Sequence, residues 1–524
     1  MAVLLNEFAV AAPQRAALID AGFEDEAGVT TWAQLNERVN RLVNALRDRG
    51  LGEGDAVVMM GGNQREAVEA SLACLHGGWL LVPVNWHWTA DELAHVIGDA
   101  TPKAVIAGEA WGDLVAAADA SVDGERVRIA VGSSVPNGFE PYETVLAAAS
   151  AEEPAEQIRG GVMFYTSGTT GHPKGVRGGL SGIGGGAEYW MFVAASIADT
   201  TELAADDPVQ LVCGPIYHSA QWVFAMTPLI KGATVVLQHR FDAAEVLRLI
   251  DRHAVTNTHL VPAQFVRLLR LPDETRASFV GASLQRVFHG AAPCPQDVKR
   301  QMIDWWGPII TEYYGGTEGG FITKIAADEW LERPASVGRP LPTIELLVVS
   351  PDGERLGVGD AGDLYFRNLL GVDFEYHNAA DKTESAHLEP GVGTLGDIGW
   401  IDDEGYLYLS DRRIDMIISG GVNIYPAEIE SVLGGHPAVV DVAVFGVPDD
   451  DMGERVLAAV VPAPGHEPGD DLAATLTAAA REHLAGYKVP REWTFHETLP
   501  RTDTGKLLKR TLREPYWAGQ QRSI

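Results

Sequence analysis

A short apolar segment followed at once by a loop of glycine and hydroxyl side chains constrains this chain more than any other stretch. Residues 162–165 have the apolar, β-prone profile of a short buried strand. Residues 166–173 are all hydroxylated, glycine, histidine or proline, and Lys174 follows them. Glycine lets backbone N–H groups approach a ligand closely, hydroxyls add donors, and a lysine adds positive charge. The stretch therefore predicts a cradle for a polyphosphate.

The loop is not a Walker A motif, which needs Gly-Lys followed by Ser or Thr. Here Lys174 follows Pro173 and precedes Gly175. A flexible surface linker is the alternative interpretation, because linkers are often rich in Ser, Thr and Gly. The strand profile in front of the loop and the lone Pro-Lys-Gly sequence behind it favour the phosphate cradle.

The N-terminal part of the chain alternates between helical and strand-like patterns. Apolar residues at helical spacing predict a helix over 31–46, with Thr31 as its N-cap, and a second helix over 66–75. Apolar runs at 55–60 and 79–85 predict strands. Such alternation predicts βαβ units and a largely parallel sheet.

A chain of 524 residues is too long for one ordinary core, so at least two domains are expected. Strand patterns at 439–447 and 456–461, with a helical pattern at 471–484, predict a compact α+β domain near the C-terminal end. The predicted fold class is therefore α/β, with a large multi-sheet N-terminal domain and a small α+β C-terminal domain.

The net charge and the cysteine content limit which partners the protein can bind and in which compartment it is expected. Acidic residues outnumber basic ones by 72 to 40, a formal net charge of −32 that argues against nucleic acid and anionic membranes as partners. The chain has no uninterrupted apolar stretch of about eighteen residues and no basic signal-peptide region, so no membrane span is expected. Three widely spaced cysteines indicate reduced thiols of a cytoplasmic protein. Because a polyphosphate is anionic and the chain is acidic overall, the phosphate site must contain lysine or arginine side chains of its own.

Four motifs together resemble one known family. They are FYTSGTTGHPKGV at 164–176, YYGGTEGG at 313–320, the segment 394–412 that begins TLGD, and PRTDTGKLLKR at 500–510. They resemble the adenylate-forming (AMP-binding) superfamily, and within it the acyl-CoA synthetase branch of fatty-acid- and aryl-CoA ligases. The resemblance covers nearly the whole chain.

This resemblance implies a domain boundary and a nucleotide site. A hinge in the segment 411–415 would join an ATP- and acid-binding domain, residues 1–411, to a mobile C-terminal domain, residues 412–524. Tyr314 would pack on adenine, and Asp397 would accept hydrogen bonds from the ribose. The implied ATP or AMP contacts are Thr166, Ser167, Gly168, Thr169, Thr170, Gly171, Gly290, Ala291, Ala292, Tyr314, Gly315, Asp397 and Arg412.

The resemblance also implies catalytic, metal, acid and CoA contacts. The implied catalytic residues are Lys506, Thr317, Glu318 and Lys174, with Glu318 and Thr166 holding Mg²⁺. His218, Trp222 and Gly316 would line the acid pocket, and Ser419, Gly420 and Gly421 would face CoA. Trp222 as a core residue remains an open alternative.

Several positions depart from the family pattern. Leu395 replaces a threonine, Gly316 replaces a larger residue, and Ile414 stands where many relatives carry Asp or Lys. The glycine-rich segment 177–186 is either a surface loop or a flap that moves with substrate.

The implied function is an AMP-forming acid–CoA ligase that activates a fatty or aromatic acid as an acyl-adenylate and passes it to CoA. Its partners would be the acid, ATP and CoA, and a homodimer is possible. An adenylate-forming enzyme of specialised metabolism is the alternative, with amide or carrier transfer or with nitrite activation for diazotisation. A nucleotide-binding regulator without chemistry is disfavoured, because the catalytic motifs are intact.

Overall fold

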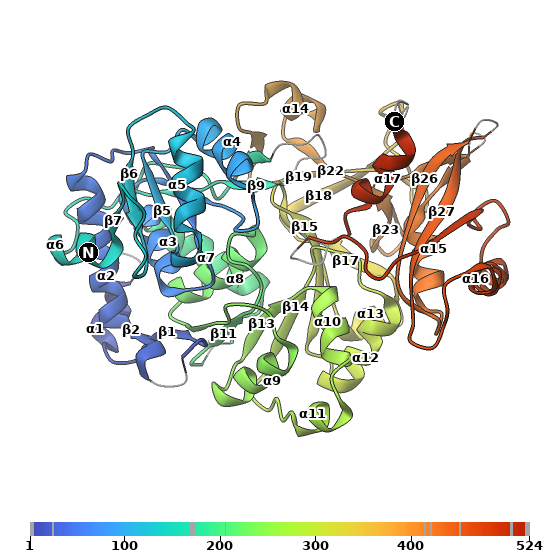
Figure 1. Ribbon diagram of the computed structural model, residues 1–524, viewed down its shortest axis with the longest axis horizontal. Coiled ribbons are helices and arrows are strands. Elements are labelled where there is room, and N and C mark those ends of the chain that lie inside the picture. The colour runs from blue at the N-terminus through green and yellow to red at the C-terminus, as the bar shows by residue number, and fades with distance from the viewer. Residues whose placement is uncertain are drawn as a thin grey trace.

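A computed structural model describes residues 5–23, 26–166, 173–204, 206–412, 415–419, 422–449, 452–502 and 507–518. Figure 1 shows three regions in a row. A six-stranded sheet with its helices lies at one end, a large sheet lies in the middle, and a five-stranded sheet lies at the other end. This arrangement confirms the predicted α/β class.

The six-stranded sheet is parallel throughout and has the order β7-β6-β5-β3-β4-β8. Its helices include α2, which begins where the sequence predicts. The Thr31 hydroxyl accepts from the Gln34 N–H, and the Gln34 side chain accepts from the Thr31 N–H, a capping box that fixes the first turn. The elements are β3 (Ala56–Met60), β4 (Leu80–Pro83), β5 (Ala104–Ala107), β6 (Val127–Ala130), β7 (Glu140–Pro141), β8 (Gly161–Val162), α2 (Trp32–Asp48), α3 (Arg65–Gly77), α4 (Ala90–Ala100), α5 (Gly112–Ala120) and α6 (Tyr142–Ala148).

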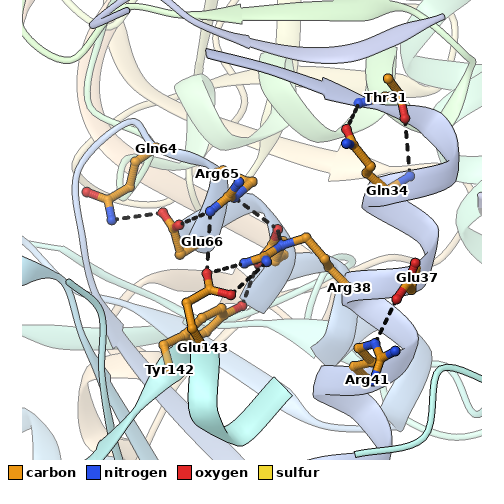
Figure 2. A network of polar contacts seen from close by, with 11 residues as sticks. Thr31, Gln34, Glu37, Arg38, Arg41, Gln64, Arg65, Glu66, Tyr142 and Glu143 are labelled. Atoms are coloured by element: carbon orange, nitrogen blue, oxygen red, sulfur yellow. Dashed lines mark hydrogen bonds and ion pairs between the residues drawn. The ribbon is translucent and has the colours of Figure 1, made fainter. Parts of the chain in front are cut away.

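An ion-pair network fastens α2, α3 and α6 together (Figure 2). The Arg38 guanidinium lies 2.5 Å from the buried Glu69 carboxylate and 2.7 Å from Glu143. The Tyr142 hydroxyl donates to Glu69 at 2.8 Å. Because a buried carboxylate is costly unless it is paired, this network holds α3 rigidly in place.

The large sheet is parallel at its centre and antiparallel on the side nearest the C-terminal region. Strands β1, β12, β11, β13, β14 and β15 pair in parallel, and β16, β17, β23, β22, β19 and β18 continue the sheet antiparallel. The strands are β1 (Ala16–Asp20), β2 (Val29–Thr31), β11 (Val209–Val212), β12 (Thr234–Leu237), β13 (Asn257–Leu260), β14 (Arg286–His289), β15 (Ile310–Gly316), β16 (Gly320–Ala326), β17 (Ser336–Pro340), β18 (Ile344–Val349), β19 (Gly362–Asn368), β21 (His387–Glu389), β22 (Val392–Ile401) and β23 (Leu407–Arg412).

Helices of the middle region pack on both sides of this sheet. Buried residues of α8 belong to the core shared with the six-stranded sheet, and those of α9, α10 and α12 form a separate core with β13 and β14. The other helices before the C-terminal region are α1 (Asn6–Ala11), α7 (Tyr189–Thr200), α8 (Ser219–Ile230), α9 (Ala243–Arg252), α10 (Pro262–Leu269), α11 (Asp273–Ser278), α12 (Gln296–Trp306), α13 (Ala327–Glu332) and α14 (Ala380–Ser385), and 3-10 turns occur at Glu26–Gly28 and Glu109–Trp111.

The predicted single strand over 162–165 is wrong, because it is two strands in different sheets. β8 ends at Val162 and pairs in parallel with β4. After Met163 the chain turns into β9 (Phe164–Thr166), which pairs antiparallel with β10 (Lys174–Arg177). A three-stranded sheet β20-β10-β9 results, with β20 (Glu375–Tyr376) on the far edge. The available pairing partners, rather than the apolar run, decide where each strand ends.

The C-terminal sheet is the compact α+β unit that the sequence predicts. Strands β26 (Val439–Asp449) and β27 (Gly453–Pro462) pair antiparallel over nearly their whole length, and α15 (Pro426–Gly434) and α16 (Asp470–His483) pack on them. Pro426 occupies the first helical turn, where its missing N–H costs nothing. The remaining elements are β24 (Ile417–Ser419), β25 (Val422–Ile424), β28 (Glu492–Phe495) and α17 (Lys509–Trp517). Within the part of the chain that the structure describes, no helix is long and apolar enough to cross a bilayer.

Candidate functional site

The predicted phosphate and metal residues meet beside the three-stranded sheet. Thr166 and Lys174 are directly paired across β9 and β10. The Lys174 ammonium lies 5.4 Å from the ring centroid of Tyr376, and the Tyr376 hydroxyl donates to Glu318 Oε1 at 3.1 Å. Desolvation and then the nearby Lys382 lower the pKa of Lys174, while Glu318 raises it. Residues from three distant parts of the chain therefore converge here. Five predicted contacts lie outside the described residues: Ser167, Gly168, Thr169, Thr170 and Gly171.

The predicted adenine loop leaves the end of β14, next to the end of β15. Gly290 is buried, and a Cβ at this position would lie 2.8 Å from the Tyr313 ring, so only glycine fits. Ala291 has a φ of 67°, a left-handed conformation that is strained for alanine, and Ala292 follows it. In sheets of this kind ligands bind outside the carboxyl ends of parallel strands. The loop and the end of β15, including Gly315, lie at such an edge.

Tyr314 and Asp397 are joined directly, although 83 residues separate them. The Tyr314 hydroxyl donates to Asp397 Oδ2 at 2.8 Å, and both side chains are buried. This hydrogen bond orients one oxygen of a carboxylate that the sequence assigns to the ribose. Arg412 pairs with Asp397 across the β22–β23 ladder, but its side chain lies outside the described part of the structure.

Thr317 has a partner that the sequence did not indicate. Its hydroxyl lies 2.9 Å from the hydroxyl of Ser219, the first residue of α8. His218 immediately precedes this helix, and its pKa is lowered to about 4 by burial and then by the charge of His87. His218 is therefore neutral near pH 7, and its Nε2 has no hydrogen-bond partner among the described residues. These features place an uncharged imidazole beside the helix start that holds Thr317.

Trp222 lies in the core. The indole has 0% exposure, packs edge-on against Phe164 and Trp190, and donates from Nε1 to Ser71 at 3.2 Å. It also lines an internal cavity of about 10 Å³ together with Tyr217. Because such a volume holds one water molecule at most, it does not accommodate an organic acid. This placement favours the core alternative for Trp222.

Two departures from the family pattern are neighbours in space. A Cβ at Gly316 would lie 3.2 Å from the Leu395 side chain and 3.5 Å from Glu318 Oε2. Leu395 thus occupies the space that a larger residue at position 316 would need. The two departures, Gly316 and Leu395, leave Asp397 and Glu318 in place and put an apolar side chain next to them.

A chain of buried, hydrogen-bonded side chains joins α8, β13 and β15. The Gln221 amide lies 2.8 Å from His259 Nδ1, and His259 Nε2 lies 3.1 Å from the Tyr313 hydroxyl. Burial lowers the pKa of His259 to about 3, so this ring is neutral. Phe224, Phe288 and Phe321 pack around Tyr313 and form a buried aromatic cluster with it.

The glycine-rich segment 177–186 is tied to the chain before it. Gly184 donates to the Arg159 carbonyl, and the Arg159 N–H donates to the Gly185 carbonyl, each at 2.9 Å. The Val162 N–H donates to the Leu180 carbonyl at 2.8 Å. These hydrogen bonds pin the segment at several points along its length.

The C-terminal candidates are only partly described. Ser419 ends β24 and pairs with Gly453 of β27. Gly420, Gly421 and Lys506 lie outside the described residues, as does Ile414 of the predicted hinge.

The donor set fits Mg²⁺ bound with a polyphosphate. No group of three or more His, Cys, Asp or Glu side chains that could hold a metal occurs among the residues the structure describes. Magnesium, however, commonly binds through one or two carboxylates plus substrate phosphates and water. Glu318, oriented by Tyr376 and close to Lys174, supplies such a carboxylate.

Sequence reasoning missed Ser219, Tyr376 and Lys382. Ser219 and Tyr376 contact Thr317 and Glu318, which lie far along the chain, and the charge of Lys382 lowers the pKa of the distant Lys174. The sole available signal was position: Ser219 directly follows His218, which the resemblance places in the acid pocket.

Comparison with known proteins gives consistent matches over both parts of the chain. The family described as AMP-binding enzyme matches residues 5–371, and the AMP-binding enzyme C-terminal domain matches residues 428–506. Feruloyl-CoA synthase of an Amycolatopsis species is 34% identical over 489 residues, which cover 93% of this chain and 94% of that protein.

Two solved structures superpose over almost the full length. O-succinylbenzoate coenzyme A synthetase from Bacillus subtilis, in complex with ATP and magnesium ion, is 28% identical with a TM-score of 0.81, covering 97% of this chain and 99% of that one. The amide bond synthetase McbA from Marinactinospora thermotolerans is 28% identical with a TM-score of 0.83, covering 96% and 97%.

Proposed function

Because the chain belongs to the AMP-binding enzyme family, the adenylate-forming acid–CoA ligases and their relatives, we propose that it activates an aromatic or fatty acid with ATP and transfers the acyl group to CoA. The observation that carries the proposal is the meeting of Lys174 and Glu318 at Tyr376. A cation and a carboxylate at one ring suit a triphosphate with its magnesium ion.

In the first half-reaction, a carboxylate oxygen of the acid bonds to the α-phosphorus of ATP. The bond from that phosphorus to the bridging oxygen breaks, and pyrophosphate leaves with the bonding electrons. Thr317 and Lys506 stabilise the charge on the α-phosphoryl oxygens, and Lys174 stabilises the departing pyrophosphate. Glu318 and Thr166 would hold Mg²⁺, which, when bound, would neutralise part of the phosphate charge.

The nucleoside is held by the remaining residues of the site. Asp397, oriented by Tyr314, accepts from the ribose hydroxyls, and Arg412 reaches the ribose or phosphate. The small side chains of Gly290, Ala291 and Ala292 leave room for the flat adenine base, with Gly315 at the end of β15. Backbone and hydroxyl groups of residues 166–171 bind the phosphates.

In the second half-reaction, the C-terminal domain, residues 412–524, rotates about the segment 411–415 and removes Lys506 from the site. The thiolate of CoA then attacks the acyl carbon, and AMP leaves with its phosphate oxygen. Ser419, Gly420 and Gly421 line the path of the thiol. Alternation of two domain arrangements lets one site perform two reactions.

The acid and the acceptor are the finer points of the proposal. The apolar Leu395 side chain beside Gly316 and the aromatic residues around Tyr313 support an acid with a flat, uncharged tail. By resemblance to the family, His218 would lie at the mouth of the acid pocket. The likeness to an amide bond synthetase supports an amine acceptor as the second candidate.

A pyrophosphate-release screen tests the proposal. Aromatic, fatty and inorganic acids, nitrite included, are each offered with ATP and Mg²⁺, with and without CoA, and the products are identified by mass spectrometry. Acid-dependent pyrophosphate release with a CoA thioester product supports a ligase. Adenylate formation with thioester from none of the acids, but with amide when an amine is added, would replace CoA by an amine. No acid-dependent pyrophosphate release would refute adenylation.

A further inference from the structure

A pair of hydroxyl side chains joins the start of α8 to the turn after β15. The hydroxyl oxygens of Ser219 and Thr317 lie 2.9 Å apart, although 98 residues separate them along the chain. Ser219 is the first residue of α8, and Thr317 directly follows the last residue of β15. Since Thr317 is the proposed donor to the α-phosphate, whatever orients its hydroxyl also affects that phosphate.

The segment that leads into Ser219 is held by a buried asparagine. The Asn63 side chain donates to the Gly214 carbonyl at 2.8 Å and accepts from the Ile216 N–H at 2.8 Å. Asn63 is buried, so these hydrogen bonds are shielded from water. They fix the path of the chain from the end of β11 to the first turn of α8.

A second link keeps α8 in register with β15. Gln221 of α8 contacts His259, and His259 contacts the Tyr313 hydroxyl, at 2.8 and 3.1 Å. Gln221 lies two residues after Ser219, and Tyr313 lies four residues before Thr317. The helix and the strand are thus joined at two nearby points, which restricts movement of Ser219 relative to Thr317.

The backbone of Thr317 lies in a tight turn. Gly316 and Gly320 are directly paired, so residues 317–319 alone connect β15 to β16. Gly320 has a φ of 63°, a left-handed conformation that favours glycine. The turn fixes the backbone of Thr317 but not its side chain, because a threonine side chain has more than one staggered rotamer. The hydrogen bond with Ser219 selects one of these rotamers.

This hydrogen bond leaves the Thr317 hydroxyl able to bind a ligand. A hydroxyl group has one donor and two acceptor lone pairs. While Thr317 donates to a phosphoryl oxygen, it can accept from the Ser219 hydroxyl. Hydrogen bonds in a chain polarise one another, so negative charge on the phosphate strengthens both. Ser219 can act in this way without touching the nucleotide.

We propose that Ser219 is a positioning residue that holds the Thr317 hydroxyl in the rotamer that donates to the α-phosphate. The assignment rests on the proposed adenylation function, because it needs a nucleotide whose α-phosphate meets Thr317. It extends the nucleotide site to α8, a helix that carries none of the nucleotide contacts inferred from the motifs.

The test compares AMP with adenosine, which lacks the α-phosphate. Binding of each is measured by calorimetry for the unaltered protein, for Ser219→Ala and for Thr317→Val. Thr317→Val loses the hydrogen bond to a charged phosphate, so AMP affinity should fall roughly tenfold to a hundredfold. Ser219→Ala loses only the orienting hydrogen bond, and AMP affinity should fall roughly three- to tenfold. Adenosine affinity should be unchanged in both variants.

Further variants separate orientation from structure. Ser219→Thr keeps the hydroxyl and should restore AMP affinity. Adding Ser219→Ala to Thr317→Val should cost nothing more, because the partner hydroxyl is already gone. Ser278→Ala is the matched control, since this exposed serine of α11 donates to the Thr275 carbonyl of its own helix. Thermal unfolding checks that each variant is folded.

Three outcomes would overturn this role of Ser219: unchanged AMP affinity in Ser219→Ala, an equal loss for adenosine, or additive losses in the double variant. Adenylation itself would still be judged by the pyrophosphate-release screen. Absence of AMP binding to the unaltered protein would instead overturn the nucleotide site, and the proposed function with it.

Discussion

Removing the Asp397 carboxylate should weaken the binding of AMP and ATP by the same factor, because both ligands carry the ribose that this residue is proposed to hold. The carboxylate is 7% exposed and accepts from Tyr314 at 2.8 Å, so it is already desolvated and oriented before a ligand arrives. A hydrogen bond to a charged group contributes about 1.5–3 kcal/mol. Asp397→Ala should therefore lower both affinities by roughly tenfold to a hundredfold, since 1.4 kcal/mol is a factor of ten.

Tyr314 supplies the second arm of the experiment. Tyr314→Phe keeps the ring but loses the donor to Asp397, and we expect a loss of about 1 kcal/mol in AMP affinity. If the hydroxyl acts only by orienting Asp397, adding Tyr314→Phe to Asp397→Ala should cost nothing more. Such non-additivity is what a double-mutant cycle detects between residues in contact.

The assay is calorimetry with AMP and a non-hydrolysable ATP analogue, with thermal unfolding as the check on folding. Asp403→Asn, an exposed carboxylate in the following turn, is the matched control and should bind normally. Wild-type AMP affinity in Asp397→Ala would remove Asp397 from the nucleotide site. Additive losses in the double variant would refute the orienting role of Tyr314.

Three other predictions concern the metal site, the Trp222 core and the buried His76. Glu318→Gln should raise the Mg²⁺ concentration needed for pyrophosphate release. Tyr376→Phe removes the hydroxyl that donates to Glu318 and should raise that concentration on the order of tenfold. An unchanged Mg²⁺ titration for Glu318→Gln would exclude Glu318 as a metal ligand. Trp222→Ala should lower the free energy of unfolding by about 3–5 kcal/mol and should reduce activity on every acid by the same factor. Unchanged stability with a shift of preference toward bulkier acids would instead place Trp222 in the acid pocket. Burial lowers the pKa of His76 to about 4, well below that of the unfolded chain, so stability is full above pH 6.5 and is lost as pH falls toward 4. Denaturation at pH 7 and pH 5 should show this loss, and His76→Phe should make the slope shallower; an unchanged slope contradicts the assignment.

Local signals predicted the elements whose stability is local. The helix α2 was predictable because Thr31 caps it and its apolar face repeats at helical spacing. The split of 162–165 into β8 and β9 was not, because only the separate partners β4 and β10 determine it. An apolar run alone does not say which sheet will receive it.

The candidate site shows the same division. Tyr314, Asp397 and Glu318 stand in motifs, so the sequence could propose them as site residues, but it could not predict the hydrogen bond between Tyr314 and Asp397. Ser219, Tyr376 and Lys382 carry no motif, and only the pairing of β20 with β10 and the start of α8 bring Tyr376 and Ser219 to their partners. Contacts between residues far apart in the sequence can be identified only once the fold is known.

The net charge of the chain also has a consequence for the rate at which a nucleotide would arrive. The chain as a whole carries a formal charge of −32 and repels an anion such as ATP at long range, while Lys174, in its proposed role, would attract it only at close range. At about 0.01 M salt the screening length is about 30 Å and the repulsion of the whole surface is felt, whereas at 0.15 M it is about 8 Å and mostly the charges close to the site act. Added salt should therefore speed association while loosening the bound complex, the reverse of the slowing that salt causes where protein and ligand carry opposite net charge.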